Sequence, residues 1–268
     1  MTAEELFKAG RLADCLKRLQ AEVRDHPADV KRRIFLFQLL SVMGDWTRAG
    51  TQLKVLAEMD AGSLLMVNIF QPILLCERLR TQVFAGKHTP LIFGEPPPWI
   101  GYLVQAAGLF GQGEDKAGRE LRDRAFEEAP ALPGKINETP FAWLADADER
   151  LGPVLELFLE GRYYWAPFER IRHIRIEPVT DLRDLVWIPV QLTWTNGGQT
   201  AAHVPTRYVE TERSDDDLIR LGKKTEWIDQ GGILVGRGQR LLATDESEYP
   251  LLEVREIEFD VPGAPAAA

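Results

Sequence analysis

Two segments of this sequence repeat one pattern at an offset of 34 residues: AGRLADCLKRLQAEVRDHP at 9–27 and MGDWTRAGTQLKVLAEMDA at 43–61. Near the start of each segment a glycine, Gly10 or Gly44, separates the amphipathic stretch before it from the amphipathic stretch after it. A large apolar residue, Leu12 or Trp46, follows the glycine two positions later. The pattern predicts two helical hairpins whose turns lie at the glycines.

A period of 34 residues is that of tetratricopeptide repeats. One hairpin cannot bury its apolar face alone, so neighbouring hairpins must stack. Further helices are expected over 64–84, where Pro72 either kinks the helix or starts it, and over 99–110 and 116–128. An ordinary helical bundle is the alternative to a repeat stack. The proline-rich stretch 129–134 ends this helical part.

The second half has a different pattern. One more amphipathic helix is expected over 147–161, and strands are then expected over 170–177, 185–195 and 199–205. A hairpin turn is predicted at Asn196-Gly197, since this pair tolerates positive φ. A short helix ends near Lys224, and four more strands follow by residue 259. The sequence therefore predicts an α+β protein: a tetratricopeptide-like α-helical domain over 1–134, a small and mostly antiparallel β-domain over 135–260, and a disordered tail over 261–268.

Charge and cysteine content limit the classes of partner and the cellular compartment that we expect. The net charge is −9, and it is uneven, because residues 1–140 carry 18 basic and 18 acidic side chains whereas 141–268 carry 14 and 23. Such a chain is a poor ligand for nucleic acid or anionic lipid. Two cysteines form no disulfide framework, and the charged N-terminus does not look like a secretory leader. The apolar run 64–76 is shorter than a membrane span. We expect a cytoplasmic protein with no nucleic-acid or membrane partner.

Few residues suggest chemistry. The four histidines have no metal-ligand spacing, and none stands in a nucleophile motif. Asp146 and Asp148 could bind a metal or a phosphate substrate if Arg183 and Arg207 lay nearby. The alternative to a non-enzymatic binding protein is therefore an enzyme that uses these residues. The ordinary interpretation of these carboxylates is helix capping. We expect no catalytic residues, no metal and no cofactor.

A block of aromatic and arginine side chains admits two interpretations. It comprises Tyr163, Tyr164, Trp165, Arg170, Arg207 and Tyr208. Tyr, Trp and Arg dominate binding hot spots, so the block is a candidate interaction surface. The other interpretation is a joint in which these side chains hold the helical half to the β half.

Several motifs, in order, resemble the ImpE family, also called TagJ, of type VI secretion accessory proteins. They are 141–156 (FAWLADADERLGPVLE), 161–165 (GRYYW), 167–171 (PFERI), 181–187 (DLRDLVW), 205–208 (PTRY), 238–240 (GQR) and 251–255 (LLEVR). The resemblance runs from about residue 3 to 259. It implies a cytoplasmic, non-enzymatic adaptor of the contractile sheath. By resemblance, its partners are the N-terminal helix of the small sheath subunit and the ClpV-type AAA+ ATPase that recycles the sheath.

An amphipathic partner helix requires a groove that accepts apolar anchors at i, i+3, i+4 and i+7. Repeat alignment predicts that the concave side of the second repeat presents Lys31, Ile34, Gln38 and Ser41, extended by Leu65, Asn68 and Ile69. The alternative is that these residues pack against the next helix. A purely structural scaffold with no helix ligand is a third possibility for the function.

Overall fold

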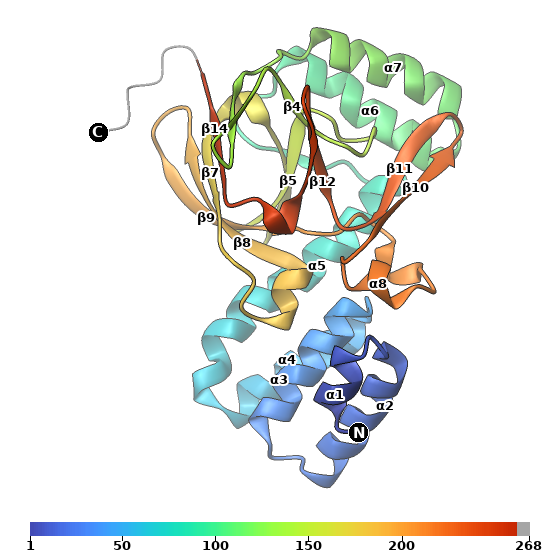
Figure 1. Ribbon diagram of the computed structural model, residues 1–268, viewed down its shortest axis with the longest axis vertical. Helices are drawn as coiled ribbons and strands as arrows, with labels where there is room; N and C mark the ends of the chain where they lie inside the picture. Colours follow the sequence, from blue (N-terminus) through green and yellow to red (C-terminus); the bar gives the residue numbers. More distant parts are fainter. Residues whose placement is uncertain (262–268) are drawn as a thin grey trace.

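The computed structural model describes residues 1–261 and places a helical part before a mostly antiparallel β part, as predicted (Figure 1). The helices are α1 (Ala3–Lys8), α2 (Leu12–Asp25), α3 (Val30–Val42), α4 (Trp46–Met59), α5 (Leu64–Phe84), α6 (Pro98–Gln112), α7 (Asp115–Glu128) and α8 (Asp217–Arg220). The strands are β1 (Leu91–Ile92), β2 (Gly134–Ile136), β3 (Thr139–Phe141), β4 (Leu144–Asp146), β5 (Val154–Leu159), β6 (Arg162–Pro167), β7 (Ile171–Ile176), β8 (Trp187–Trp194), β9 (Gln199–Pro205), β10 (Thr225–Gln230), β11 (Ile233–Gly238), β12 (Leu241–Thr244), β13 (Glu248–Pro250) and β14 (Glu256–Phe259).

The two repeated segments form the hairpins α1–α2 and α3–α4, with their turns at the predicted glycines. Gly10 and Gly44 have φ of +69° and +72°, a region that favours glycine. At Gly44 a Cβ atom would lie 2.3 Å from the Cγ of Glu212, so a side chain has no room there. The small residues Cys15 and Ala49 are fully buried at the helix crossings. The prediction of two hairpins is thus confirmed.

The β part is built on a nine-stranded sheet in the order β1-β6-β5-β9-β8-β7-β14-β2-β3. Among the pairings of this sheet within residues 1–261, β1–β6 alone is parallel. The predicted turn at Asn196-Gly197 joins β8 to β9, with Gly197 at φ +83°. A hairpin of β10 and β11 and a small sheet of β13, β12 and β4 complete this part. The predicted α+β class is therefore correct.

One predicted element is wrong. The structure has no helix over 147–161; it has a turn followed by β5, and all six residues of β5 are buried. Apolar and polar residues do not alternate along β5, because both of its faces are buried and its one charged residue, Glu156, is buried as well. Without that alternation the segment resembles part of a helix.

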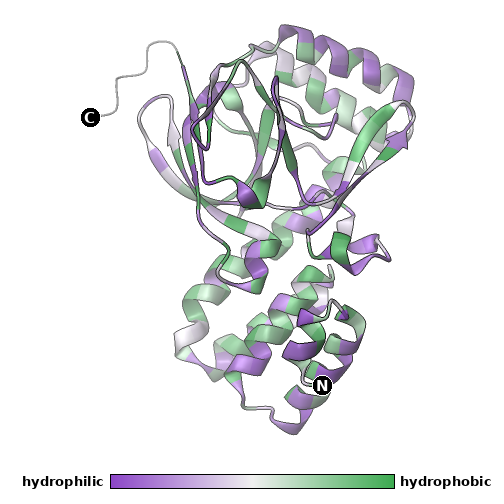
Figure 2. Cartoon of the chain, in the orientation of Figure 1, coloured by the Kyte–Doolittle hydropathy of each residue, from purple (hydrophilic) through white to green (hydrophobic). Residues whose placement is uncertain are grey.

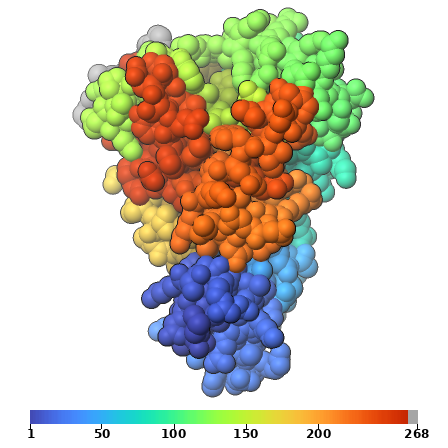
Figure 3. All heavy atoms as spheres, turned by 45° about the vertical axis from the view of Figure 1, so that its right-hand side comes forward, coloured from blue at the N-terminus to red at the C-terminus, as the bar shows by residue number. Residues whose placement is uncertain are grey.

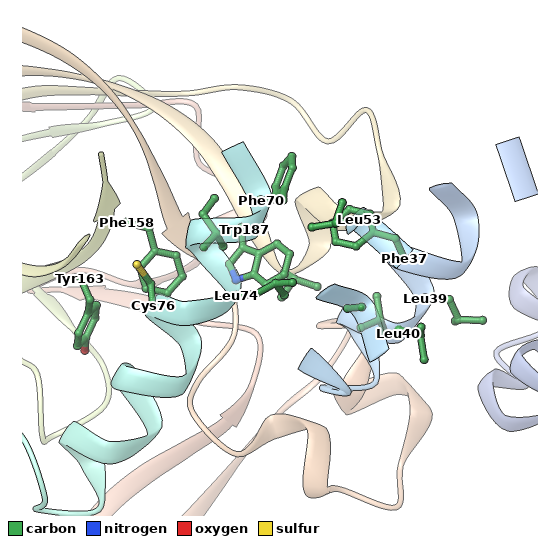
Figure 4. Close-up of a cluster of buried hydrophobic side chains, with 14 of the residues drawn as sticks. Phe37, Leu39, Leu40, Leu53, Phe70, Leu74, Cys76, Phe158, Tyr163 and Trp187 are labelled. Atoms are coloured by element: carbon green, nitrogen blue, oxygen red, sulfur yellow. The ribbon is translucent and has the colours of Figure 1, made fainter. Parts of the chain in front are cut away.

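Helix α5 is the centre of the molecule. A continuous apolar cluster runs from the repeat hairpins through α5 to the sheet, and Figure 4 shows part of it, including Phe37, Phe70 and Trp187. Helices α6 and α7 lie beside the β part, where Phe110 of α6 packs with Val235 of β11 (Figure 1). The outward face of α7 is strongly hydrophilic (Figure 2). The division into two domains at residue 134 stays a prediction. The predicted tail at 261–268 lies outside the described residues, except for Val261.

One described helical stretch, 61–84, is long and apolar enough to cross a membrane by length and composition alone. In the fold it packs against other elements on several sides and carries the buried Glu77 and Arg80. Pro72 lies inside this helix and does not start it, so the second of the two predicted alternatives is wrong. One face of this helix belongs to the core, and 39% of its apolar window is buried.

Candidate functional site

An open apolar groove of about 430 Å³ lies between α1, α3 and the short 3-10 helix η3 (Leu182–Leu185) that follows β7. We call it the α1–α3 groove. It is lined by Glu4, Phe7, Lys8, Lys31, Ile34, Phe35, Gln38, Asp181 and Leu182. The rings of Phe7 and Phe35 meet edge to face at 6.2 Å, and the lining also includes acidic and basic side chains. An apolar strip with charges of both signs beside it can hold one face of an amphipathic helix.

Local sequence signals position the walls of this groove. Thr2 and Glu5 form a capping box that starts α1, and Asp29 caps α3. Lys31, Ile34 and Gln38 follow at i, i+3 and i+7, which places them on one face of α3. The Gln38 side chain donates a hydrogen bond at 3.2 Å to Asp181, the N-cap residue of η3, and this bond joins η3 to α3.

The structure brings together only part of the predicted concave surface. Lys31, Ile34 and Gln38 line the α1–α3 groove, although Gln38 is 6% exposed. Ser41 is fully buried, and its hydroxyl donates to the carbonyl of Phe37. The other predicted residues, Leu65, Asn68 and Ile69, lie on α5 outside this groove. Sequence reasoning missed Asp181 and Leu182, because they come from the β half.

Most of the aromatic–arginine block lies inside the molecule. Tyr163, Trp165, Arg207 and Tyr208 are each at most 4% exposed. Tyr164 is half-buried and packs edge to face on Phe93, and Arg170 donates to the carbonyl of Glu95 at 2.8 Å. Trp165 packs on Phe84 of α5, and Arg207 binds the end of α3, as the joint interpretation requires. Tyr208 packs instead on Trp227 of β10, and Tyr164 and Arg170 contact the loop that follows β1, so the joint interpretation applies to part of the block.

A buried ion network links α5 to the β part, and we call it the central ion network. Its members are Glu77, Arg80, Asp146, Asp148, Arg150, Glu156 and Arg240. Arg80 makes two hydrogen bonds to Glu156, at 2.8 and 2.9 Å, and Arg240 bridges Glu156 and Asp146. The Tyr163 hydroxyl donates to Glu156 and accepts from Trp165, and Trp187 donates to Glu77.

The pKa values of the carboxyl groups in this network are shifted in different directions, because their partners differ. Burial raises the pKa of Glu156, but Arg80 and Arg240 outweigh it and bring this pKa down to about 2. Burial raises the pKa of Asp146 to about 6, since Arg240 offsets it only in part. Burial also raises the pKa of Glu77. Each of these groups is occupied by structural hydrogen bonds.

The arrangement required by the enzyme alternative is not assembled. Asp148 binds Arg150 and Asp146 binds Arg240, whereas Arg183 binds Asp181 and packs over Phe70. Arg207 donates instead to backbone carbonyls, including that of Val42 at 2.8 Å. Within residues 1–261, no cluster of three His, Cys, Asp or Glu side chains could hold a metal ion. The two aspartates also precede a turn and a strand, so their predicted role as helix caps is wrong.

Sequence reasoning also missed Glu77, Arg80 and Arg240. Two opposite charges three residues apart inside the apolar stretch of α5 were the available signal. For Arg240 the available signal was its place in the motif at 238–240.

Comparisons with known proteins agree with the motifs. The family model ImpE, described as ImpE protein, matches residues 138–258. The type VI secretion system accessory component TagJ of Pseudomonas aeruginosa is 53% identical over 260 residues, which cover 97% of this chain and 92% of that protein. A crystal structure of a Vibrio parahaemolyticus protein shares the fold, with a TM-score of 0.88, 24% identity, and coverage of 96% and 97% of the two chains. The chain therefore belongs to the ImpE family, as does the accessory component TagJ.

Proposed function

We propose that this chain is a cytoplasmic, non-enzymatic adaptor of a type VI secretion system that binds the N-terminal helix of the small sheath subunit. The relationship to TagJ supports an accessory role in that system. The α1–α3 groove supports helix binding and is the observation that carries the proposal. An additional contact with the ClpV-type ATPase is part of the same proposal and rests on the family resemblance.

The groove suggests how such a helix would bind. Apolar side chains at i, i+3 or i+4, and i+7 would pack on Phe7, Ile34 and Leu182. The rim charges at Glu4, Lys8 and Lys31 would pair with the polar flanks and set the orientation. The contact would involve both halves of the protein, because Leu182 belongs to η3.

The test is a calorimetric titration with a synthetic peptide of the small sheath subunit's N-terminal helix, with a scrambled peptide as control. Saturable binding of the native peptide alone is expected. Ile34→Glu should weaken it at least tenfold, because it places a charge on the apolar floor. Leu234→Glu is the matched control, since Leu234 is 48% exposed on β11 and outside the groove. Equal affinity of wild type and Ile34→Glu would reject this groove as the binding site. No binding by a folded protein would favour the scaffold alternative.

A further inference from the structure

A second groove lies along α5, where an apolar stripe has no partner within the described chain. Leu65, Ile69 and Leu75 are 73%, 37% and 58% exposed, although buried residues on the opposite face of α5 belong to the core. The half-buried Pro72 continues the stripe between them. Their spacing places these side chains along one side of the helix over about three turns.

This stripe borders a cavity of about 540 Å³, which we call the α5 groove. Ile69 and Pro72 form one wall, and Pro189, Ala201 and His203 of β8 and β9 form the other. The α5 groove and the α1–α3 groove share no lining residue. Two of the predicted concave residues, Asn68 and Ile69, therefore belong to this second groove.

The charges in the α5 groove have one sign. Its lining includes Glu160 and Glu177 but neither lysine nor arginine. Glu160 is exposed and Glu177 is half-buried, and within residues 1–261 neither side chain makes an ion pair or a hydrogen bond, so both carboxylates can pair with a cationic partner. Burial lowers the pKa of the remaining ionisable lining group, His203, to about 4, and this imidazole is neutral at physiological pH. The groove also belongs mainly to the half of the chain that carries the whole excess of acidic residues.

We propose that the α5 groove is a docking site for a basic amphipathic helix of a partner protein. Its apolar face would cover Leu65, Ile69 and Pro72, and lysine or arginine side chains on its flank would pair with Glu160 and Glu177. The apolar stripe supplies the affinity, and the unpaired carboxylates select the charge of the partner. This inference goes beyond the proposed function, because the site is separate and can be occupied together with the α1–α3 groove.

The probe is an 18-residue helical peptide with leucines on one face and lysines on the other. A second peptide keeps the leucines and replaces each lysine by glutamate. Calorimetry with the full chain should show saturable binding of the lysine peptide only. Glu160→Lys combined with Glu177→Lys should weaken it at least tenfold, and Ile69→Ser combined with Leu65→Ser should do the same. Glu120→Lys combined with Glu127→Lys is the charge-matched control on the exposed face of α7 and should change affinity less than twofold.

A fluorophore on Asn68→Cys should report the same titration from inside the groove. Selective labelling is feasible, because Cys15 and Cys76 are buried and their thiol pKa values are raised to about 11 and 12. Equal weakening by both double glutamate variants would overturn the proposal, since binding would then be to acidic surface in general. Self-association of the wild type that Ile69→Ser abolishes would also overturn it, in favour of a second copy. Ile34→Glu should leave binding unchanged, so failure here is distinguishable from failure of the proposed function.

Discussion

The two joints of this molecule are built in different ways. Helix α5 is fixed to the sheet by the central ion network and by aromatic side chains, and Arg80, Glu156 and Arg240 in that network are at most 3% exposed. The hairpins α1–α4 contact the β half through apolar packing, such as Trp46 on Trp187 with ring centroids 5.7 Å apart, and through a few polar bonds at helix ends. Asp217 accepts from the N–H of Leu12 at the start of α2, and Arg207 donates to the Val42 carbonyl at the end of α3. Figure 3 shows the segment around α8 lying directly against these first helices.

The two joints therefore have different physical roles. Buried charges are costly to remove from water, so the central ion network is stable only when all its partners are present. The bonds at helix ends satisfy backbone groups that any helix leaves unpaired, and each contributes modestly. We therefore expect the first joint to control whether the β half folds around α5, and the second to contribute to the orientation of the repeat hairpins.

The largest expected effect comes from removing the charge that two arginines share. Glu156→Gln keeps the shape but leaves Arg80 and Arg240 without their common carboxylate. We expect a loss of about 3–5 kcal/mol in the free energy of unfolding, measured by urea denaturation. Glu160→Gln, one residue beyond the same strand, should change stability by less than about 0.5 kcal/mol. A small effect of Glu156→Gln would show that the network does not hold this joint.

An intermediate effect on the free energy of unfolding is expected when the pH is lowered. His203 packs against Phe70 of α5, with ring centroids 5.5 Å apart, and its pKa is about 4 in the folded state. The unfolded chain binds this proton near pH 6.5, so His203 lowers stability as the pH falls from about 6.5 to about 4, by up to about 3 kcal/mol. Asp146, with a raised pKa of about 6, acts in the opposite direction. The difference between the pH–stability profiles of wild type and His203→Gln isolates the histidine, and identical slopes would contradict the assignment.

The smallest expected effect is at the second joint. Asp217→Ala removes the acceptor for the first N–H of α2, which has no side-chain cap of its own. A loss of about 1 kcal/mol is expected, with faster hydrogen exchange at Leu12. Asp215→Ala is the control, because Asp215 is exposed and makes no such bond. If both variants behave alike, the contact does not contribute to the orientation of the hairpins.

The elements with local signals were predictable. The 34-residue offset and the two glycines predicted the hairpins, and the Asn196-Gly197 pair predicted the β8–β9 turn. Strand β5 was not predictable, because burial on both faces removes the alternation that distinguishes a strand. The α1–α3 groove was predicted in part, through Lys31, Ile34 and Gln38, because they share a helix face.

By itself, the sequence determined the helical hairpins, the α+β class and, through its ordered motifs, the family. The tertiary structure alone decided which motif residues are surface and which are core. It buried Arg207, Tyr208 and Arg240. Of the predicted concave residues, it placed Lys31, Ile34 and Gln38 in one groove and Asn68 and Ile69 in the other. The physical reason is that helices and turns depend on neighbouring residues, whereas burial and ion pairing depend on partners such as Glu156 and Arg80, 76 positions apart in the chain.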